Sequence, residues 1–477
     1  MYTSTRSKMN VNASNAIIDG IAPDGGLFVK ELSNKFSYED LLKLSTLSYK
    51  ELAFEIMKLF FNDFKEDDLK SLIEKAYTNT FDIDNLVEVK SFNGFSFLEL
   101  YHGRTLAFKD VALSILPHLL DQSKKINNIK ENTIILTATS GDTGSAALCG
   151  FNEGDSTKMI VLYPTQGVSK IQEKQMLSFS SDKQKVIAIN GNFDDAQRLV
   201  KKAFNDEQNK EYNLSSANSI NIGRLVPQIV YYFYSYFQEN KDCKEKVNFV
   251  VPTGNFGNIL AGYISKKLGL PVNKLICASN SNNVLYDFFR TKVYDRNREF
   301  YKTISPSMDI LVSSNLERLL YHISNNENEV KEMMESLNKT GKYETSLEFK
   351  DFYSEYVDID NTYIGIKEVY DKYNYLIDPH TAVGYMAYKN YVKETKDNTK
   401  TIIASTAHPF KFPEAICKAL GIKFNGEFEA IEELSEKCNV KCPEMFKKLK
   451  QEYKKTVWEK EDAYDNLCEL IKVLAND

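Results

Sequence analysis

Short apolar runs alternate with helix-like segments along the middle of the chain, and this alternation limits the possible folds more than any other feature of the sequence. Strand-like runs are expected at 132–139, 159–163, 185–189, 247–251, 275–279 and 401–405. The stretches between them show the spacing of apolar residues that is typical of helices. Strands that alternate with helices form a mainly parallel sheet, and such sheets bind ligands at the carboxyl ends of their strands. We therefore predict a doubly wound α/β fold.

The two ends of the chain differ from this middle part. Residues 1–90 contain a turn signal, Asp24-Gly25-Gly26, and then helical periodicity from about residue 41, with a second helix at 67–76. Residues 416–477 carry runs of Lys and Glu that indicate peripheral helices. A length of 477 residues allows more than one domain. We predict a mostly helical N-terminal domain (1–90), an α/β catalytic core (91–415) and a C-terminal helical region (416–477).

Charge and hydropathy exclude some classes of partner. The chain has 60 basic and 66 acidic residues, so it lacks the excess of positive charge that is typical of nucleic-acid-binding proteins. A local anion site remains possible, because a few backbone amides can bind one phosphate. Residues 1–12 are polar, and the longest uncharged stretch, 247–265, is interrupted by Asn and Gly. We therefore expect a cytoplasmic protein without a membrane span.

The seven cysteines do not indicate a disulfide framework. Their number is odd and they are scattered along the chain. Only Cys438 and Cys442 are close in sequence, and the chain contains just five histidines. We expect reduced thiols and no metal site.

Two glycine-rich turns each connect a predicted strand to a predicted helix. The first is Ser140-Gly141-Asp142-Thr143-Gly144, and the second is Gly254-Asn255-Phe256-Gly257-Asn258. Backbone amides at a helix start can bind an anion, although an ordinary tight connection would look similar. The second turn lacks the Gly-Lys-Ser/Thr of a nucleotide-binding P-loop and the glycine spacing of a dinucleotide fingerprint. It therefore suggests a site for a single phosphate.

Lys109 follows the apolar run Leu106-Ala107-Phe108, at the start of a helix predicted over 111–120. A lysine at such a position is commonly a solvated residue. In an apolar setting, however, desolvation lowers the pKa of the amine and makes it nucleophilic. A Schiff-base lysine together with a loop that binds one phosphate is what pyridoxal phosphate requires.

Several segments resemble, in the same order, those of the threonine synthases in the tryptophan-synthase-β-like group of pyridoxal-phosphate enzymes. They span most of the chain, at 22–28, 102–110, 139–144, 168–176, 218–224, 254–258, 378–384 and 405–409. Arg104 departs from the pattern, since the family usually has Pro there, and the segment around Gln166 also differs. The resemblance implies a two-lobed core of fold type II, a small-molecule substrate and a monomer or homodimer.

The resemblance also implies a role for each matching residue. Lys109 would bind the cofactor covalently and act as base and acid. The loop Gly254, Asn255, Phe256, Gly257 and Asn258 would bind the cofactor phosphate, and Thr406 would contact the pyridine nitrogen. Ser140, Asp142 and Thr143 would line the substrate carboxylate and the phenolic oxygen of the cofactor. The candidates for the substrate phosphate are Ser169, Lys174, Asn221 and Arg224.

The activity implied by the resemblance is conversion of O-phospho-L-homoserine and water to L-threonine and phosphate. Phosphate would leave in a γ-elimination, and water would then add at the β-carbon. Three alternatives stay open at this point. They are a related lyase that releases 2-oxobutanoate, a dehydratase or cysteine synthase whose substrate carries no phosphate, and a non-catalytic protein that has kept the fold.

Overall fold

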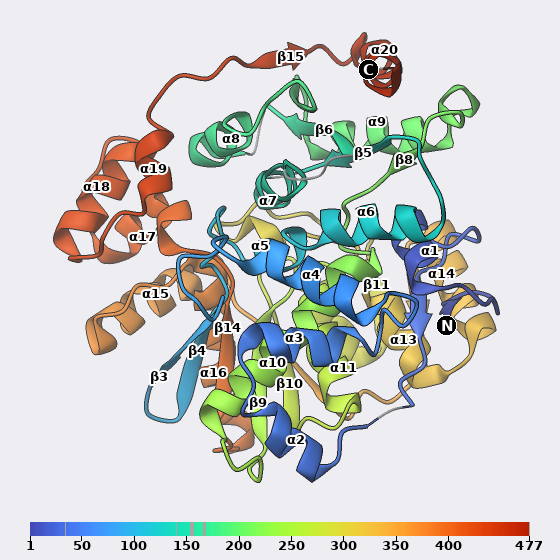
Figure 1. Ribbon diagram of the computed structural model, residues 1–477. Coiled ribbons are helices and arrows are strands. Elements are labelled where there is room, and N and C mark those ends of the chain that lie inside the picture. The colour runs from blue at the N-terminus through green and yellow to red at the C-terminus, as the bar shows by residue number, and fades with distance from the viewer. Residues whose placement is uncertain (34, 140, 153–156, 166–167, 477) are drawn as a thin grey trace.

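The largest sheet has six strands in the order β13-β10-β9-β14-β4-β3 (Figure 1). The structure is a computed structural model that describes residues 1–33, 35–139, 141–152, 157–165 and 168–476. The strands are β3 (Glu88–Ser91), β4 (Phe95–Glu99), β9 (Val247–Pro252), β10 (Val272–Ser279), β13 (Phe352–Tyr356) and β14 (Thr401–Ser405). All neighbours run parallel except β3, which is antiparallel to β4.

Helices cover both faces of this sheet, which explains why its central strands are apolar runs without alternation. Val250 and Ile403 point into a core with helices α15 (Ile359–Tyr373) and α16 (Pro379–Thr395). Phe249 and Ile402 point to the opposite face, where they share a core with α10 (Ile222–Glu239) and α11 (Gly257–Lys267). We call this sheet and its helices the large lobe.

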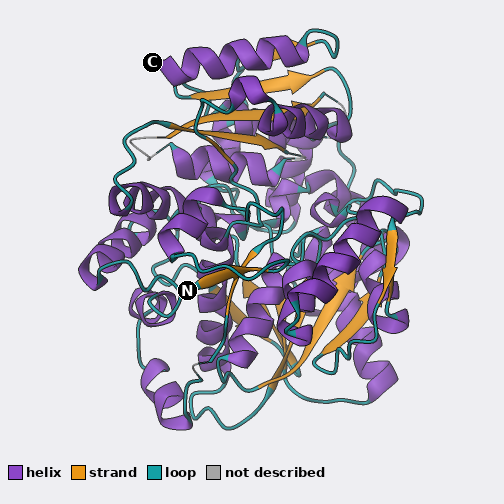
Figure 2. Cartoon of the chain, turned by 90° about the vertical axis from the view of Figure 1, so that its right-hand side faces the viewer, coloured by secondary structure: helices purple, strands orange, loops and turns teal. Residues whose placement is uncertain are grey.

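The second sheet has five parallel strands in the order β15-β7-β6-β5-β8. They are β5 (Thr133–Ala138), β6 (Thr157–Pro164), β7 (Gln184–Ile189), β8 (Leu214–Ser215) and β15 (Thr456–Trp458). One face packs on α9 (Phe193–Asn205) and α20 (Ala463–Asn476), and the other on α7 (Asp142–Phe151). Figure 2 shows α20 lying along this sheet at the end of the molecule. With α8 (Lys170–Leu177), these elements form the small lobe.

The N-terminal unit packs against the large lobe. It contains the antiparallel pair β1 (Tyr2–Ser4) and β2 (Phe28–Lys30) and the helices α1 (Ala13–Asp19), α2 (Tyr38–Leu44), α3 (Tyr49–Met57) and α4 (Glu66–Tyr77). The fully buried Arg318 fixes the unit in place, since it donates to the carbonyl oxygens of Phe28 and Ile220 and to the side chain of Asn315. Arg318 lies on α13 (Leu316–Ser324).

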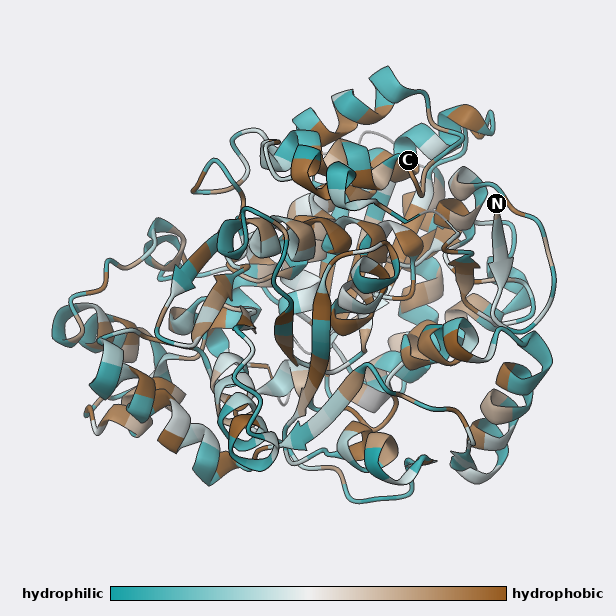
Figure 3. Ribbon diagram, turned by 90° about the horizontal axis from the view of Figure 1, so that it is seen from below, coloured by the Kyte–Doolittle hydropathy of each residue, from teal (hydrophilic) through white to brown (hydrophobic). Residues whose placement is uncertain are grey.

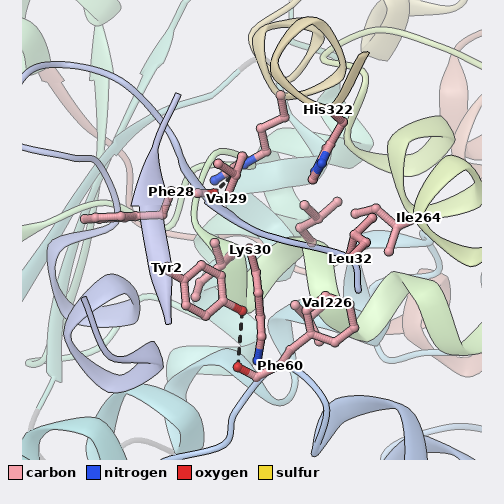
Figure 4. A pocket seen from close by; sticks show the side chains of 12 residues that line it. Tyr2, Phe28, Val29, Lys30, Leu32, Phe60, Val226, Ile264 and His322 are labelled. Atoms are coloured by element: carbon pink, nitrogen blue, oxygen red, sulfur yellow. Dashed lines mark hydrogen bonds between the residues drawn. The ribbon is translucent and has the colours of Figure 1, made fainter. Parts of the chain in front are cut away.

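A small pocket lies where β1 and β2 meet α10, α11 and α13 (Figure 4). Most of its lining is apolar, including Phe28, Val226 and Ile264, and the Tyr2 hydroxyl donates to the carbonyl oxygen of Phe60 over 3.3 Å. None of the site residues predicted from the sequence lines it. We therefore regard it as a packing gap at the junction of the N-terminal unit.

The remaining elements connect or cover the lobes. The helices are α5 (Lys109–Leu113), α6 (Leu116–Ile126), α12 (Val284–Thr291), α14 (Glu327–Thr340), α17 (Pro413–Leu420), α18 (Glu427–Lys437) and α19 (Glu444–Lys448). The two further strands, β11 (Val293–Asp295) and β12 (Lys342–Glu344), pair with each other. Figure 3 shows apolar ribbon concentrated in the interior, while the outer helices alternate between polar and apolar residues. No helix of the described chain is long and apolar enough to cross a membrane.

The predicted doubly wound, mainly parallel α/β class is confirmed, and each of the six expected strands is present within a few residues of its expected bounds. The helix predicted over 111–120 is wrong as a single element, because a turn at Ser114 and Ile115 separates α5 from α6, whose first turn contains Pro117. The C-terminal region is not purely helical, since β15 extends the small-lobe sheet along β7. The predicted domain boundaries at 90 and 415 fall inside β3 and α17, and the three-part division stays a prediction.

Candidate active site

Lys109 is the first residue of α5, and its side chain is only 12% exposed. Its Nζ atom lies 3.3 Å from the hydroxyl oxygen of Ser307 and 4.0 Å from a carboxylate oxygen of Asp142. Burial lowers the pKa of Lys109 to about 8; the Asp142 carboxylate opposes this change, and the cations Lys411 and Arg224 add to it. Such an amine is partly uncharged near neutral pH, so it can act as a nucleophile and as a base.

The loops that follow β4 and β14 bring Lys109 close to Thr406. The two strands are parallel neighbours, so both loops leave the sheet at the same edge. The amide of Phe108 donates to the carbonyl oxygen of Thr406 over 2.8 Å, and the amide of His408 donates to that of Leu106 over 3.0 Å. Thr406 itself is buried at this junction. Two residues predicted to contact the cofactor therefore lie on paired segments.

Asp142, the first residue of α7, is surrounded by donors. Its carboxylate lies 3.0 Å from Nζ of Lys411 and 3.1 Å from Nε2 of Gln172, and the Ser307 hydroxyl donates to it over 3.4 Å. Burial tends to raise the pKa of Asp142, but Lys411 and Lys109 outweigh burial and hold this pKa well below its usual range.

An ionised carboxylate repels a carboxylate ligand. The contacts of Asp142 therefore favour a role in organising the two lysines over the predicted role in binding the substrate carboxylate. Thr143 is half-buried at the next position of α7, and Ser140 lies outside the described residues. For Ser140 and Thr143, the predicted contact with the substrate carboxylate stays a prediction.

The second glycine-rich turn connects β9 to α11, and side chains from a distant segment hold its carbonyl oxygens. The carbonyl oxygen of Gly254 accepts from the Ser313 hydroxyl over 2.6 Å, and that of Asn255 accepts from the backbone amide and the side chain of Asn315, each over 3.0 Å. Phe256 has a φ of 66°, and helix α11 begins at the next residue. Because the first amides of a helix have no partner within it, they are available to an anion.

One donor of this turn fits a ligand with acceptor oxygens. The Asn258 side chain accepts from the hydroxyls of Tyr231 and Tyr232, while its buried Nδ2 donor has no hydrogen-bond partner among the described residues. A methyl group on Gly254 would lie 2.4 Å from the carbonyl oxygen of Ser307, so only glycine fits there. Buried donors without partners are costly, and a bound phosphate would supply the acceptors.

We expect Gly254→Ala to lower the stability of the protein by about 1–3 kcal/mol, because the added methyl forces the Ser307 backbone to move. Gly257→Ala is the matched control, since its methyl would lie 3.5 Å from the nearest atom, Nδ2 of Asn315, which is an ordinary contact. Thermal unfolding followed by circular dichroism should show a clear drop in the melting temperature for the first variant alone. Equal melting temperatures would show that Gly254 is not confined.

The segment 218–224 contributes a buried cation. Arg224 donates from Nη1 to the carbonyl oxygen of Ala217 over 2.7 Å, but its Nε has no hydrogen-bond partner and no carboxylate of the described chain forms an ion pair with it. Burial lowers the pKa of Arg224 to about 10. A guanidinium that is buried, incompletely bonded and close enough to influence Lys109 is suited to an anionic ligand such as a phosphate.

The other candidates for the substrate phosphate have structural contacts. Asn221 caps α10, since its Oδ1 accepts from the amide of Gly223 and its Nδ2 donates to the carbonyl oxygen of Ile17. Ser169 caps α8. Lys174 donates to the carbonyl oxygen of Gln451 and pairs with Glu452, each over 3.0 Å.

Gln172 and Gln175 occupy the inner face of α8, and Lys174 is directed to the C-terminal region. The structure therefore does not bring Lys174 into the cluster around Lys109. The contacts favour Arg224 among the four candidates, and the phosphate roles of Ser169, Lys174 and Asn221 stay predictions.

Three residues of the site were not among the site residues predicted from the sequence. Ser307 comes from the long connection between β11 and α13, Gln172 from α8 within the matched segment 168–176, and Lys411 from the turn two residues after Pro409. Lys411 lies within a few residues of the matched segment 405–409, so proximity to that segment could have suggested it. Ser307 could be found only from its contacts.

Comparisons with known proteins show the family to which the chain belongs. A family model described as "Threonine synthase N terminus" matches residues 1–77, one described as "Pyridoxal-phosphate dependent enzyme" matches 77–406, and one described as "Threonine synthase, C-terminal" matches 381–456. Threonine synthase of Saccharomyces cerevisiae is 39% identical over 470 residues, covering 90% of this chain and 91% of the relative. Threonine synthase of Pseudomonas aeruginosa is 40% identical over 428 residues, covering 88% and 90%.

Solved structures show the same relationship. The crystal structure of threonine synthase from yeast has a TM-score of 0.89 and 36% identity, and the match covers 100% of this chain and 98% of the other. The structure of threonine synthase from Brucella melitensis with bound pyridoxal phosphate has a TM-score of 0.88 and 33% identity, with coverage of 100% and 99%.

Proposed function

The chain belongs to the threonine synthase family of pyridoxal-phosphate-dependent enzymes, and we propose that it converts O-phospho-L-homoserine and water to L-threonine and phosphate. One observation carries this proposal. Two separate places suited to an anion, the turn 254–258 and the buried Arg224, lie near the buried Lys109. A cofactor phosphate and a substrate phosphate would account for both.

The residues present fit the cofactor. Lys109 would hold it covalently, the amides of the turn 254–258 with Asn258 would hold its phosphate, and Thr406 would contact its ring nitrogen. When bound, pyridoxal phosphate supplies an electron-withdrawing ring that stabilises negative charge on the carbon atoms next to the substrate amine.

The chain itself would bind the substrate and move its protons. Arg224 would hold the substrate phosphate in a direction suited to its departure from Cγ. Once the substrate amine has displaced it, Lys109 Nζ would be free to take the proton from Cα and to return a proton after water has added at Cβ. A base with a pKa near the working pH is effective in both directions, and burial gives Lys109 such a pKa.

We include in this proposal a cytoplasmic location and a monomer or homodimer.

The test is to incubate the purified full-length protein with O-phospho-L-homoserine and to measure phosphate, threonine and 2-oxobutanoate together. We expect equal amounts of phosphate and threonine. Phosphate accompanied by 2-oxobutanoate would identify the related lyase instead. A protein that shows the visible absorption band of lysine-bound cofactor but releases no phosphate would be a non-catalytic relative or an enzyme for another substrate.

A further inference from the structure

Lys411 is a second lysine of the site, and it is more deeply buried than Lys109, with a residue exposure of 1%. Its Nζ lies 2.8 Å from the carbonyl oxygen of Thr105, 3.0 Å from Oδ1 of Asp142 and 3.1 Å from Oε1 of Gln175. An ammonium group has three N–H donors, so all of them are used. The acceptors come from the Lys109 segment, the first glycine-rich turn and α8.

Packing alone does not explain a charged group at this position. Burying two charges costs several kcal/mol, and replacing a buried ion pair with apolar side chains is often neutral or stabilising. The contacts suggest a different reason, because the Asp142 carboxylate lies between two lysines. One of its oxygens is 3.0 Å from Lys411, whereas the other is 4.0 Å from Lys109. The carboxylate therefore interacts more strongly with Lys411 than with Lys109.

We propose that Lys411 is a positioning residue that occupies the Asp142 carboxylate and so keeps the Lys109 amine from forming a close ion pair, which favours the uncharged, reactive amine. The proposal depends on the proposed function only in that Lys109 is taken as the reacting amine.

The charges around Lys109 change its pKa in the directions that this role of Lys411 requires. After burial, which is the main cause, the Lys411 and Arg224 cations lower the pKa of Lys109, whereas Asp142 and Asp110 raise it. These groups come from η3 (Pro409–Lys411), α10, α7 and α5 respectively. Asp110 is itself held by the amide and hydroxyl of Thr105. Asp142 is therefore the carboxylate for which Lys109 and Lys411 compete.

The test measures the amine directly, without substrate. The full-length protein, freed of cofactor, is labelled with trace acetic anhydride at a series of pH values, and the peptide that contains Lys109 is quantified. In the wild type, labelling of Lys109 should reach half of its maximum, the midpoint, near pH 8. In Lys411→Met a cation is lost, and the Asp142 carboxylate interacts with Lys109 alone. Both changes raise the pKa of Lys109, so the midpoint of labelling should rise by about one pH unit. At pH 7 the capture of added pyridoxal phosphate should slow by about tenfold, since one unit is a factor of ten in the uncharged fraction.

Three further variants separate this role from a merely structural one. Lys411→Arg keeps the charge and should leave the midpoint near the wild-type value. Asp142→Asn removes the carboxylate and should move the midpoint downward. Lys158→Met is the matched control, because Lys158 is also buried but donates to the carbonyl oxygen of Leu474 in the small lobe; its midpoint should not change.

A folded Lys411→Met protein whose midpoint equals or falls below that of the wild type would overturn the proposal. If Lys411→Met does not fold, as judged by circular dichroism, an unchanged or raised midpoint in Asp142→Asn would overturn it instead. Because the labelling needs no substrate, either outcome is independent of whether the wild-type protein forms threonine.

Discussion

Lys109→Ala is expected to abolish covalent attachment of the cofactor and to reduce threonine formation by about 10³-fold or more, since proton transfer by a positioned group alone contributes up to about 10⁴-fold. Lys109 is the amine that the fold presents between the Ser307 hydroxyl and the Asp142 carboxylate. The visible absorption band should disappear. In the wild type, borohydride reduction followed by peptide mapping should place the pyridoxyl group on the peptide that contains Lys109.

Lys158→Met serves again as the control, because it changes a buried lysine outside the site. It should keep both the absorption band and the label on Lys109. A pyridoxyl label on any other lysine of the wild type would contradict the assignment. Lys109→Ala should also keep a stable fold, because the substitution removes a buried amine whose burial is unfavourable for the charged form.

Arg224→Met is expected to lower kcat/KM by about 30- to 1000-fold, which corresponds to about 2–4 kcal/mol of transition-state binding for a charged contact to phosphate. The loss should appear mainly in substrate affinity and in inhibition by inorganic phosphate. Cofactor binding should persist, because the turn 254–258 is intact. Arg224→Lys should recover little activity, since an ammonium cannot bind phosphate through two parallel hydrogen bonds.

Arg224→Met should be at least as stable as the wild type, and this result would distinguish a functional arginine from a structural one. Arg224 lacks a carboxylate partner among the described residues and has an unpaired Nε, so its burial is unfavourable until a ligand binds. Arg318 is the matched control: it is equally buried, but donates to three acceptors. Thermal unfolding should therefore show a lower melting temperature for Arg318→Met only. If Arg224→Met loses the cofactor but keeps its affinity for the substrate, the assignment to the substrate phosphate is wrong.

Local sequence was sufficient to identify the strands that organise the site. β5, β9 and β14 are buried on both faces, so each appears in the sequence as a continuous apolar run. The glycines of the two turns and Lys109 directly follow such runs or begin the next helix, and their chemistry is visible within a few residues. β15 was missed because Thr456, Val457 and Trp458 form a strand only by pairing with the edge of β7. The break between α5 and α6 does carry a local signal that the prediction of one helix over 111–120 did not use, because Pro117 stands in the first turn of α6 and has no amide proton to donate to the preceding turn.

The sequence by itself therefore determined the alternating α/β architecture and the places of the two glycine-rich turns and of Lys109 within it, because each depends on residues that are neighbours along the chain. Only the tertiary structure decided which side chains face that lysine. Ser307 and Lys411 are 198 and 302 residues away from Lys109, yet one contacts its amine and the other competes with it for Asp142. The structure also directed Lys174 to the C-terminal region and left Arg224 without a carboxylate partner among the residues that it describes. Hydrogen bonds and charge interactions act over a few ångströms in space, and the distance between residues in space is set by the packing of the two lobes rather than by their separation in sequence.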